Sequence, residues 1–463
     1  MEAADFARFG RWAEGLLGGR VVRAERQGER RSGGRPAWFL DLDCGGETVA
    51  CYARMDRGAE QLISREFTLE REYRVLRALG ESGARVPRVH GYCADPAGIL
   101  MERVAGDFDY TAIAPGPVRD ALDDDFLGEL ARIHALPAER FVAAGLEPPP
   151  SGEACVLHDL ALWERAYRRD LKRPVPLVEF ALRWLKANRP AAPERLSLVQ
   201  GDTGPGQFLF SGARLTAIID WEFAHLGDPI LDLAQIRTRD FYNPGIDLGR
   251  WIARYEALSG RPVDRGKLAY YTVKSMAITP LALAGMVQGM HPRTDHAEWF
   301  AQDVAYKRAT AEALLEALGL EPDPPALPSP NASRTDRSAI FDLVEENLRE
   351  EHRPGAPDDY ARYRIDLLAR LVTHLRRADV HGEALERQEL DEIATLVGQR
   401  PQTAAEGDHA LARFIASSPR AAEPAIATHL YRRALREEAL WRGALGAGER
   451  AVHQRLGAGR SDR

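Results

Sequence analysis

Two short apolar runs, each followed closely by an aspartate, constrain this chain more than any other feature. The runs are residues 196–199 and 215–219, and the aspartates are Asp202 and Asp220. Strands so short and apolar are buried, so their ends present both carboxylates at one edge of a core. Because a buried acid without a partner is costly, we expect a cation close to them. Mg²⁺ prefers carboxylate and phosphate oxygens, and phosphoryl transfer requires that arrangement.

The residues before this segment change from strand-like to helical patterns. A predicted helix over residues 62–79 is surrounded by four stretches rich in strand formers, at 37–42, 48–54, 86–92 and 98–104. From about residue 126 onward, apolar side chains recur at helical spacing. We therefore predict a β-rich lobe with one helix over residues 1–104 and a mostly helical lobe over 105–320, with a cleft between them.

A proline-rich stretch separates these lobes from the rest of the chain. Residues 321–335 contain five prolines, which favour an extended linker. Beyond it, residues 336–463 are predicted to form a separate helical domain with a frayed tail from Gly446. Amphipathic helices are indicated around 340–348, 368–375, 385–396, 411–415 and 426–440.

Composition excludes several classes of partner. The 463 residues carry a net charge of −7, so no overall basic field attracts nucleic acid or an acidic membrane. The four cysteines show no metal-ligand spacing, and the first residues lack a signal-peptide core. The most apolar stretch, 276–290, is too short to span a bilayer. We expect a cytoplasmic protein that binds neither nucleic acid nor membrane.

The segment from 198 to 234 resembles the catalytic motif of the aminoglycoside phosphotransferase and choline kinase-like family. The matching residues are Gln200-Gly201-Asp202, Gln207, Asp220-Trp221-Glu222, Gly227-Asp228-Pro229 and Asp232-Leu233-Ala234. The resemblance implies that Asp202 is the catalytic base and Asp220 the principal Mg²⁺ ligand, with Gln207 as a second ligand. It implies that Asp228 and Asp232 brace the catalytic loop.

The resemblance covers about residues 10–320 and implies an α+β fold: a bilobal protein-kinase-like fold with a β-rich N-lobe and a helical C-lobe, followed by a C-terminal all-α bundle. It implies that ATP and Mg²⁺ are bound. Arg54 would contact the phosphates and pair with Glu72, for which Glu66 is an alternative in the same helix. The other implied nucleotide-binding residues are a phosphate-covering turn at Ser32, Gly33 and Gly34, and a hinge for adenine at Glu102 and Val104.

Two positions depart from the family pattern. Gln200 stands where the family usually has histidine, and Gln207 stands where it has asparagine. The extra methylene of Gln207 shifts its amide by about a bond length, and catalysis is sensitive to such displacements. By this resemblance, Gln207→Asn is expected to raise activity or leave it unchanged. The alternative function is a nucleotide-binding, pseudokinase-like regulator, or a scaffold whose lobes bind no nucleotide.

The predicted function is ATP- and Mg²⁺-dependent transfer of phosphate to a hydroxyl of a small molecule. The family phosphorylates varied acceptors, and its members related to this chain are fused to or found beside acyl-CoA dehydrogenase-like proteins. A hydroxyacyl-CoA is therefore a candidate acceptor. Basic residues are frequent in 160–188 and 266–318, which disfavours a polycationic drug. The C-terminal helical domain carries no chemical motif and is a candidate surface for a homodimer or a protein partner.

Overall fold

The computed structural model describes residues 3–27, 35–56, 67–290, 295–328 and 335–456. Its N-terminal lobe is a five-stranded antiparallel sheet with the strand order β1-β2-β3-β5-β4. The strands are β1 (Arg20–Gln27), β2 (Ala37–Asp43), β3 (Thr48–Met55), β4 (Val89–Ala94) and β5 (Ala97–Glu102). Two helices belong to this lobe, α1 (Ala3–Leu17) and α2 (Leu69–Glu81).

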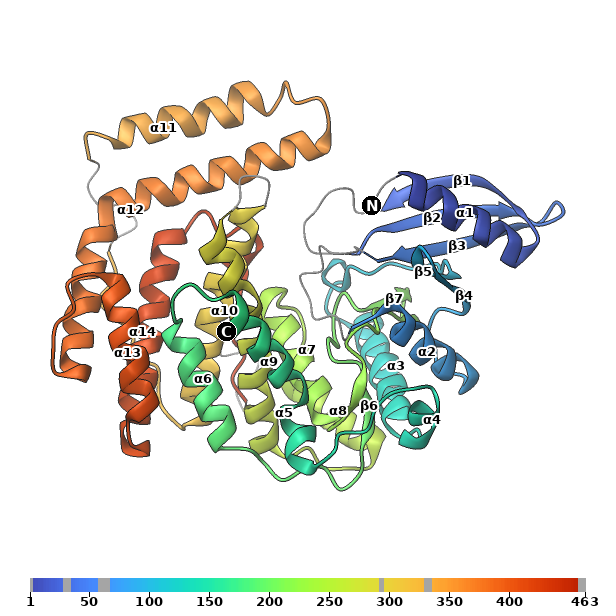
Figure 1. The fold of residues 1–463 in the computed structure, drawn as a ribbon, viewed down its shortest axis with the longest axis horizontal. Coiled ribbons are helices and arrows are strands. Elements are labelled where there is room, and N and C mark those ends of the chain that lie inside the picture. Colours follow the sequence, from blue (N-terminus) through green and yellow to red (C-terminus); the bar gives the residue numbers. More distant parts are fainter. Residues whose placement is uncertain (1–2, 28–34, 57–66, 291–294, 329–334, 457–463) are drawn as a thin grey trace.

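The two helices contribute to different apolar clusters, and the alternation of side chains along the strands explains why. Leu100 of β5 packs in a cluster with Phe9 of α1, whereas its neighbours Ile99 and Met101 pack with residues of α2. Successive strand residues point to opposite faces of a sheet, so α1 and α2 cover opposite faces. The lobe therefore has helices on both sides, and α2 lies on the side that contacts the C-lobe (Figure 1).

The C-terminal lobe is mainly helical and holds two small two-stranded antiparallel sheets. One pairs β6 (Ser197–Val199) with β9 (His225–Gly227), and the other is a hairpin of β7 (Phe208–Ser211) and β8 (Arg214–Ile218). A short 3₁₀ turn, η2 (Tyr110–Ala112), precedes its helices. The helices are α3 (Pro117–His134), α4 (Ala138–Ala143), α5 (Gly152–Asp170), α6 (Pro176–Ala187), α7 (Ile230–Tyr242), α8 (Leu248–Ser259), α9 (Arg265–Gly289) and α10 (His296–Ala317).

The remaining helices pack on this lobe and extend beyond it. Helix α14 lies against α10, α13 lies against α6, and the α11–α12 pair projects from the same end of the molecule (Figure 1). Arg183 of α6 bonds to Ile415 and Ser418 at the end of α13, which ties the two regions together. The elements are α11 (Ser338–Glu346), η3 (Asn347–His352), α12 (Asp359–Val397), α13 (Ala404–Ser417), η4 (Arg420–Ala422), α14 (Glu423–Trp441) and η5 (Gly446–Arg450).

The α+β, two-lobed architecture with a C-terminal all-α region is confirmed, and several details were wrong. The N-lobe has two helices rather than one, because α1 precedes the sheet. Helix α2 begins at Leu69, where the Thr68 hydroxyl accepts a hydrogen bond from the Arg71 N–H; part of the predicted span, 62–66, lies outside the described residues. The two helices expected at 368–375 and 385–396 are one continuous helix, α12.

The tail was also wrongly predicted to be frayed from Gly446. Residues up to Leu456 are described, and Gln454 is buried against α7. Its backbone oxygen accepts hydrogen bonds from Arg237, at 2.9 Å from Nε, and its side-chain amide donates to Asp240. As for the helices, none within the described ranges is long and apolar enough to cross a membrane.

Candidate active site

The loop that carries Asp202 is fixed by Asp232 of α7. The Asp232 carboxylate is fully buried and accepts hydrogen bonds of 2.9 Å from the backbone N–H groups of Gln200 and Gly201. His134 of α3 lies 3.0 Å from the same carboxylate. Burial alone would raise the pKa of Asp232, but these donors favour the charged form and the pKa lies below its usual range. Asp232 therefore braces the loop, as the resemblance implied for it.

Gly201 occupies a position that no larger residue fits. Its φ is +88°, and a Cβ there would lie 2.8 Å from the backbone oxygen of Phe223. The β6–β9 sheet pairs Val199 with His225, and this brings the loop after β6 against the turn after β8. The motif glycine thus allows the two chemistry-bearing turns to approach each other.

Asp220 sits in a strained turn directly after β8. It has a φ of +61°, in the left-handed region that residues other than glycine rarely adopt. The Gln200 side-chain amide donates to the backbone oxygen of Ile219 at 2.6 Å and to that of Asp220 at 3.3 Å. Gln200 therefore braces this turn.

Arg54 of β3 joins the two lobes at this turn. Its Nη1 lies 2.8 Å from Glu72 of α2 and 2.7 Å from Asp220, and its Nη2 lies 3.2 Å from Glu222. Arg35 contacts Glu222 as well, at 3.0 Å. Arg54 is thus shared by three carboxylates, one from the N-lobe and two from the C-lobe. Burial raises the pKa of Glu72 to about 7, against the opposing effect of Arg54.

Asp202 has two partners that differ in chemistry. Nη1 of Arg239, on α7, lies 2.7 Å from each carboxylate oxygen, and the Gln207 side-chain amide donates to Oδ2 at 2.5 Å. Burial raises the pKa of Asp202, and Asp220 adds to this effect, while Arg239 and Gln207 oppose it. The backbone N–H of Ile219 donates to the backbone carbonyl of Gln207 at 2.9 Å, which places Gln207 beside Asp220.

The remaining predicted residues are only partly assembled into this site. Ser32, Gly33 and Gly34 lie outside the described residues, as does Glu66. Glu102 ends β5, where its backbone N–H donates to the backbone oxygen of Arg88. Val104 follows the strand, and within the described ranges its backbone N–H makes no hydrogen bond.

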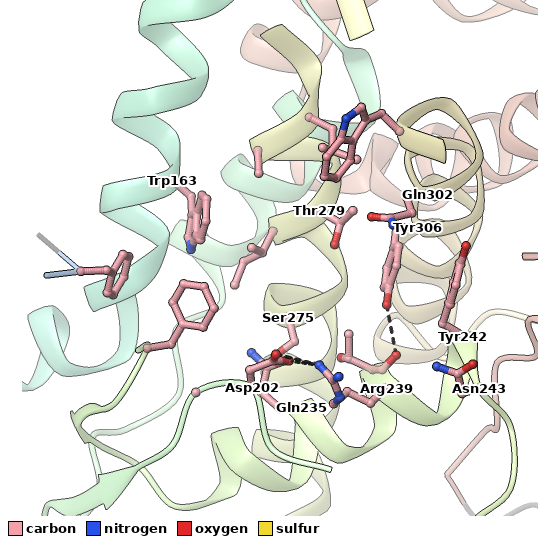
Figure 2. A pocket seen from close by; sticks show the side chains of 18 of the residues that line it. Trp163, Asp202, Gln235, Arg239, Tyr242, Asn243, Ser275, Thr279, Gln302 and Tyr306 are labelled. Atoms are coloured by element: carbon pink, nitrogen blue, oxygen red, sulfur yellow. Dashed lines mark hydrogen bonds and ion pairs between the residues drawn. The ribbon is translucent and has the colours of Figure 1, made fainter. Parts of the chain in front are cut away.

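A cavity of about 390 Å³ opens above Asp202 (Figure 2). Figure 2 shows Asp202 and Arg239 together on one side of it, with Trp163 on one flank and Tyr306 on the other. Its described lining is aromatic, aliphatic or neutral and polar, apart from Asp202, Arg239 and His225. The lining residues from the last two helices of the lobe are Ser275, Ile278, Thr279, Ala282, Leu283 and Met286 of α9 and Trp299, Gln302 and Tyr306 of α10.

The family motif does not include Arg239 or the cavity wall. Arg239 follows Asp232 by seven residues, which is two helical turns, so both lie on the same face of α7. Because Asp232 is part of the motif, that spacing is a signal that identifies Arg239 as a neighbour of the catalytic loop. Helices α9 and α10 carry no comparable signal.

Comparisons with known proteins agree with this geometry. Residues 64–271 match the model of the phosphotransferase enzyme family. The chain is 24% identical over 287 residues to acyl-CoA dehydrogenase family member 11 of Rattus norvegicus, covering 57% of this chain and 36% of the relative. It is 29% identical over 366 residues to the probable acyl-CoA dehydrogenase IBR3 of Arabidopsis thaliana, covering 70% of this chain and 40% of the relative.

The chain thus spans less than half the length of these curated relatives. Among solved structures, a putative aminoglycoside phosphotransferase from Ralstonia eutropha superposes with a TM-score of 0.50 at 22% identity, covering 67% of this chain and 96% of that one. This likeness shows the fold, with its sheet-bearing N-lobe and helical C-lobe. Residues 64–271 are accordingly similar to the phosphotransferase enzyme family, and the chain shares the two-lobed fold of that solved structure.

Proposed function

We propose that this chain transfers the γ-phosphate of ATP, with Mg²⁺, to a hydroxyl group of a small molecule. The observation that carries the proposal is the position of Asp202, which lies at the cavity and beside the turn that holds Asp220. A carboxylate at this place orients an acceptor hydroxyl and takes its proton. The match to the phosphotransferase family over 64–271 supports the same reaction class.

The residues present fit a magnesium ion. Arg54 pairs with Oδ1 of Asp220, and Oδ2 has no partner among the described residues. Gln207 donates its side-chain N–H to Asp202, which leaves its amide oxygen, Oε1, without a described partner. A carboxylate and an amide oxygen are hard ligands of the kind Mg²⁺ takes. Asp220 and Gln207 are therefore the groups that would hold the ion, which neutralises phosphate charge and orients the nucleotide when bound.

The chain's own residues have separable functions in this proposal. Arg54 provides a guanidinium fork for phosphate oxygens, and Glu72 holds it from the N-lobe. Val104 offers a free backbone N–H at the hinge, as far as the described residues go. As Asp202 accepts the proton, the acceptor O–H bond breaks and an oxygen–phosphorus bond forms. The bond from the γ-phosphorus to the β-phosphate oxygen breaks, and ADP leaves with its electron pair.

We propose further that the acceptor is a hydroxyacyl metabolite, such as a hydroxyacyl-CoA, rather than a polycationic drug. Asp202 is the only carboxylate among the described residues of the cavity lining, and Arg239 already neutralises it. A polyamine would find no other acidic partner there. Ile278, Ala282 and Met286 form one stripe on α9 that is about 12 Å long, which suits an apolar chain. The names of the acyl-CoA dehydrogenase relatives support the same chemistry.

A nucleotide-binding regulator is the second candidate. The observation that favours it is that both aspartates are paired with arginines, Asp202 with Arg239 and Asp220 with Arg54. Tight binding of Mg-ATP without turnover on any acceptor would support this candidate. Absence of any thermal shift with Mg-ATP would instead indicate a scaffold.

The deciding experiment measures ADP release with Mg-ATP and a panel of acceptors. Hydroxyacyl-CoA thioesters, sugars and a kanamycin-type aminoglycoside are compared at equal concentration. We expect turnover with a hydroxyacyl thioester and none with the matched acyl thioester that lacks the hydroxyl. Turnover with the aminoglycoside alone would contradict the acceptor class but leave the reaction type intact.

A further inference from the structure

Arg239 uses only part of its guanidinium group to brace the loop that carries Asp202. Its Nε donates to the backbone oxygen of Pro205 at 2.9 Å, and its Nη1 holds both oxygens of Asp202. Its Nη2 makes no hydrogen bond to any residue in the described part of the chain. A guanidinium is planar and always charged, and its Nη2 carries two N–H groups. Both of these donors are therefore available at the centre of the site.

The loop leaves space around this free nitrogen. Gly206 has a φ of +88°, and a Cβ built on it would lie 3.3 Å from Nη2 of Arg239. That distance is tighter than most Cβ contacts, so a larger residue would crowd the guanidinium. Arg239 also lines the cavity, beside Asp202, and Tyr306 lines the same cavity (Figure 2). Its charge is therefore available to a group that enters between the loop and the cavity.

The positive charge of Arg239 indicates what kind of group enters between the loop and the cavity. Arg239 influences both aspartates, because its charge lowers the pKa of Asp202 and that of Asp220. Arg239 also pairs with the proposed base, Asp202, and lines the cavity, so its positive charge lies where a phosphoryl group is transferred under the proposed function.

We propose that Arg239 is a catalytic residue that donates from Nη2 to the oxygens of the transferred phosphoryl group. The proposal rests on the proposed phosphotransferase function and adds to the family motif a cation supplied by the chain itself. In the nucleotide-free protein Arg239 holds Asp202 in place. During transfer the same side chain stabilises the charge on the phosphoryl oxygens, as a guanidinium fork does wherever it meets phosphate.

The test compares the affinities of two nucleotides that differ only in the γ-phosphate. Mg-ADP and the Mg complex of β,γ-imido-ATP are titrated by calorimetry against the wild-type chain and Arg239→Gln. Loss of a charge-assisted hydrogen bond weakens binding by about 10- to 100-fold. We expect that loss for the imido-ATP complex, and a change of less than about threefold for ADP.

Two further variants keep the test decisive. Arg239→Lys retains the positive charge beside Asp202, so this variant is less prone to misfold than Arg239→Gln. We expect its affinity for imido-ATP to lie between those of the wild-type chain and Arg239→Gln. Arg250→Gln is the matched control, since Arg250 also pairs with aspartates of the C-lobe, Asp120 at 2.7 Å and Asp123 at 2.8 Å. It lies outside the described cavity lining, and we expect both affinities to remain at the wild-type value.

The outcomes separate this proposal from the proposed function. If Arg239→Gln and Arg239→Lys weaken both nucleotides equally, or neither, Arg239 is a bracing residue only and the proposal is overturned. If the wild-type chain binds neither nucleotide in Mg²⁺, the phosphotransferase function itself is wrong. Selective loss of imido-ATP affinity in both variants, with the control unchanged, supports the proposal.

Discussion

Replacing the two site aspartates one at a time should produce two different defects. Asp202→Asn keeps the shape of the side chain, and its amide oxygen still accepts a hydrogen bond from Arg239. The variant loses the negative charge that takes the acceptor's proton, so we expect kcat to fall by roughly 10²–10⁴, the usual contribution of a positioned general base. The described partners of Asp202 include neither Arg54 nor Glu72, so the affinity for Mg-ATP should change little.

Asp220→Asn should weaken nucleotide binding as well. Asp220 is the proposed metal ligand and one of the three carboxylates around Arg54. Removing its charge weakens the Mg²⁺ site, so we expect Mg²⁺-dependent ATP affinity to fall by about tenfold or more. The loss should disappear when nucleotide binding is measured in EDTA, because the metal then no longer contributes.

Coupled ADP release gives kcat, and calorimetry with and without Mg²⁺ gives affinity. Asp120→Asn is a suitable control, because Asp120 pairs with Arg250 at 2.7 Å and is largely exposed. It should behave as wild type in both assays. The site assignment would be refuted if Asp202→Asn and Asp220→Asn left turnover and affinity unchanged. Identical losses of affinity in both would refute the separate functions assigned to them.

Two other predictions follow from contacts that the sequence does not reveal. Gln207→Asn should lower kcat by about tenfold, measured by ADP release, since a side chain one methylene shorter loses the 2.5 Å hydrogen bond to Asp202; an increase would favour the outcome expected from the family motif. Acid should destabilise the docked tail: burial would raise the pKa of Glu316, but His453 and Arg237 hold it at about 2, against 4.5 when unfolded. Its contribution of about 3 kcal/mol is complete above pH 4.5 and lost as pH falls toward 2, so melting temperatures should drop over that window and less steeply in Glu316→Gln.

The catalytic loop was the most predictable part of the molecule because its signals are local. Apolar runs with an aspartate just beyond each one have few ways to fold, and they form strands β6 and β8 of the two small sheets. Asp232 braces the loop through two backbone N–H groups, as the resemblance to the family implied. Arg54 and Glu72 are 18 residues apart, and their 2.8 Å contact required the strand and helix to be placed correctly.

Two helices were harder to predict for reasons that lie in their composition. Helix α1 has apolar residues at helical spacing, including the buried Phe9 and Ala13, but Gly10 and Gly15 lower its intrinsic helix propensity. The middle of α12, around residues 376–384, is polar on most sides, so no apolar stripe connects its two halves. Its continuity depends on packing against α11, α13 and α14, which a pattern within α12 alone does not reveal.

The two sides of the site differ in how far short sequence motifs indicate their proposed functions. The nucleotide side depends on charged residues in short motifs, so the sequence alone is enough to propose functions for Asp220 and Arg54. The acceptor side is a wall of neutral side chains from α5, α9 and α10, none of which belongs to a motif. Burial of such residues is what any helical core requires, so their pattern does not distinguish a binding wall from ordinary packing. Only the fold shows that this wall ends at Asp202, so under the proposed function the choice of acceptor depends on the tertiary packing of the C-lobe.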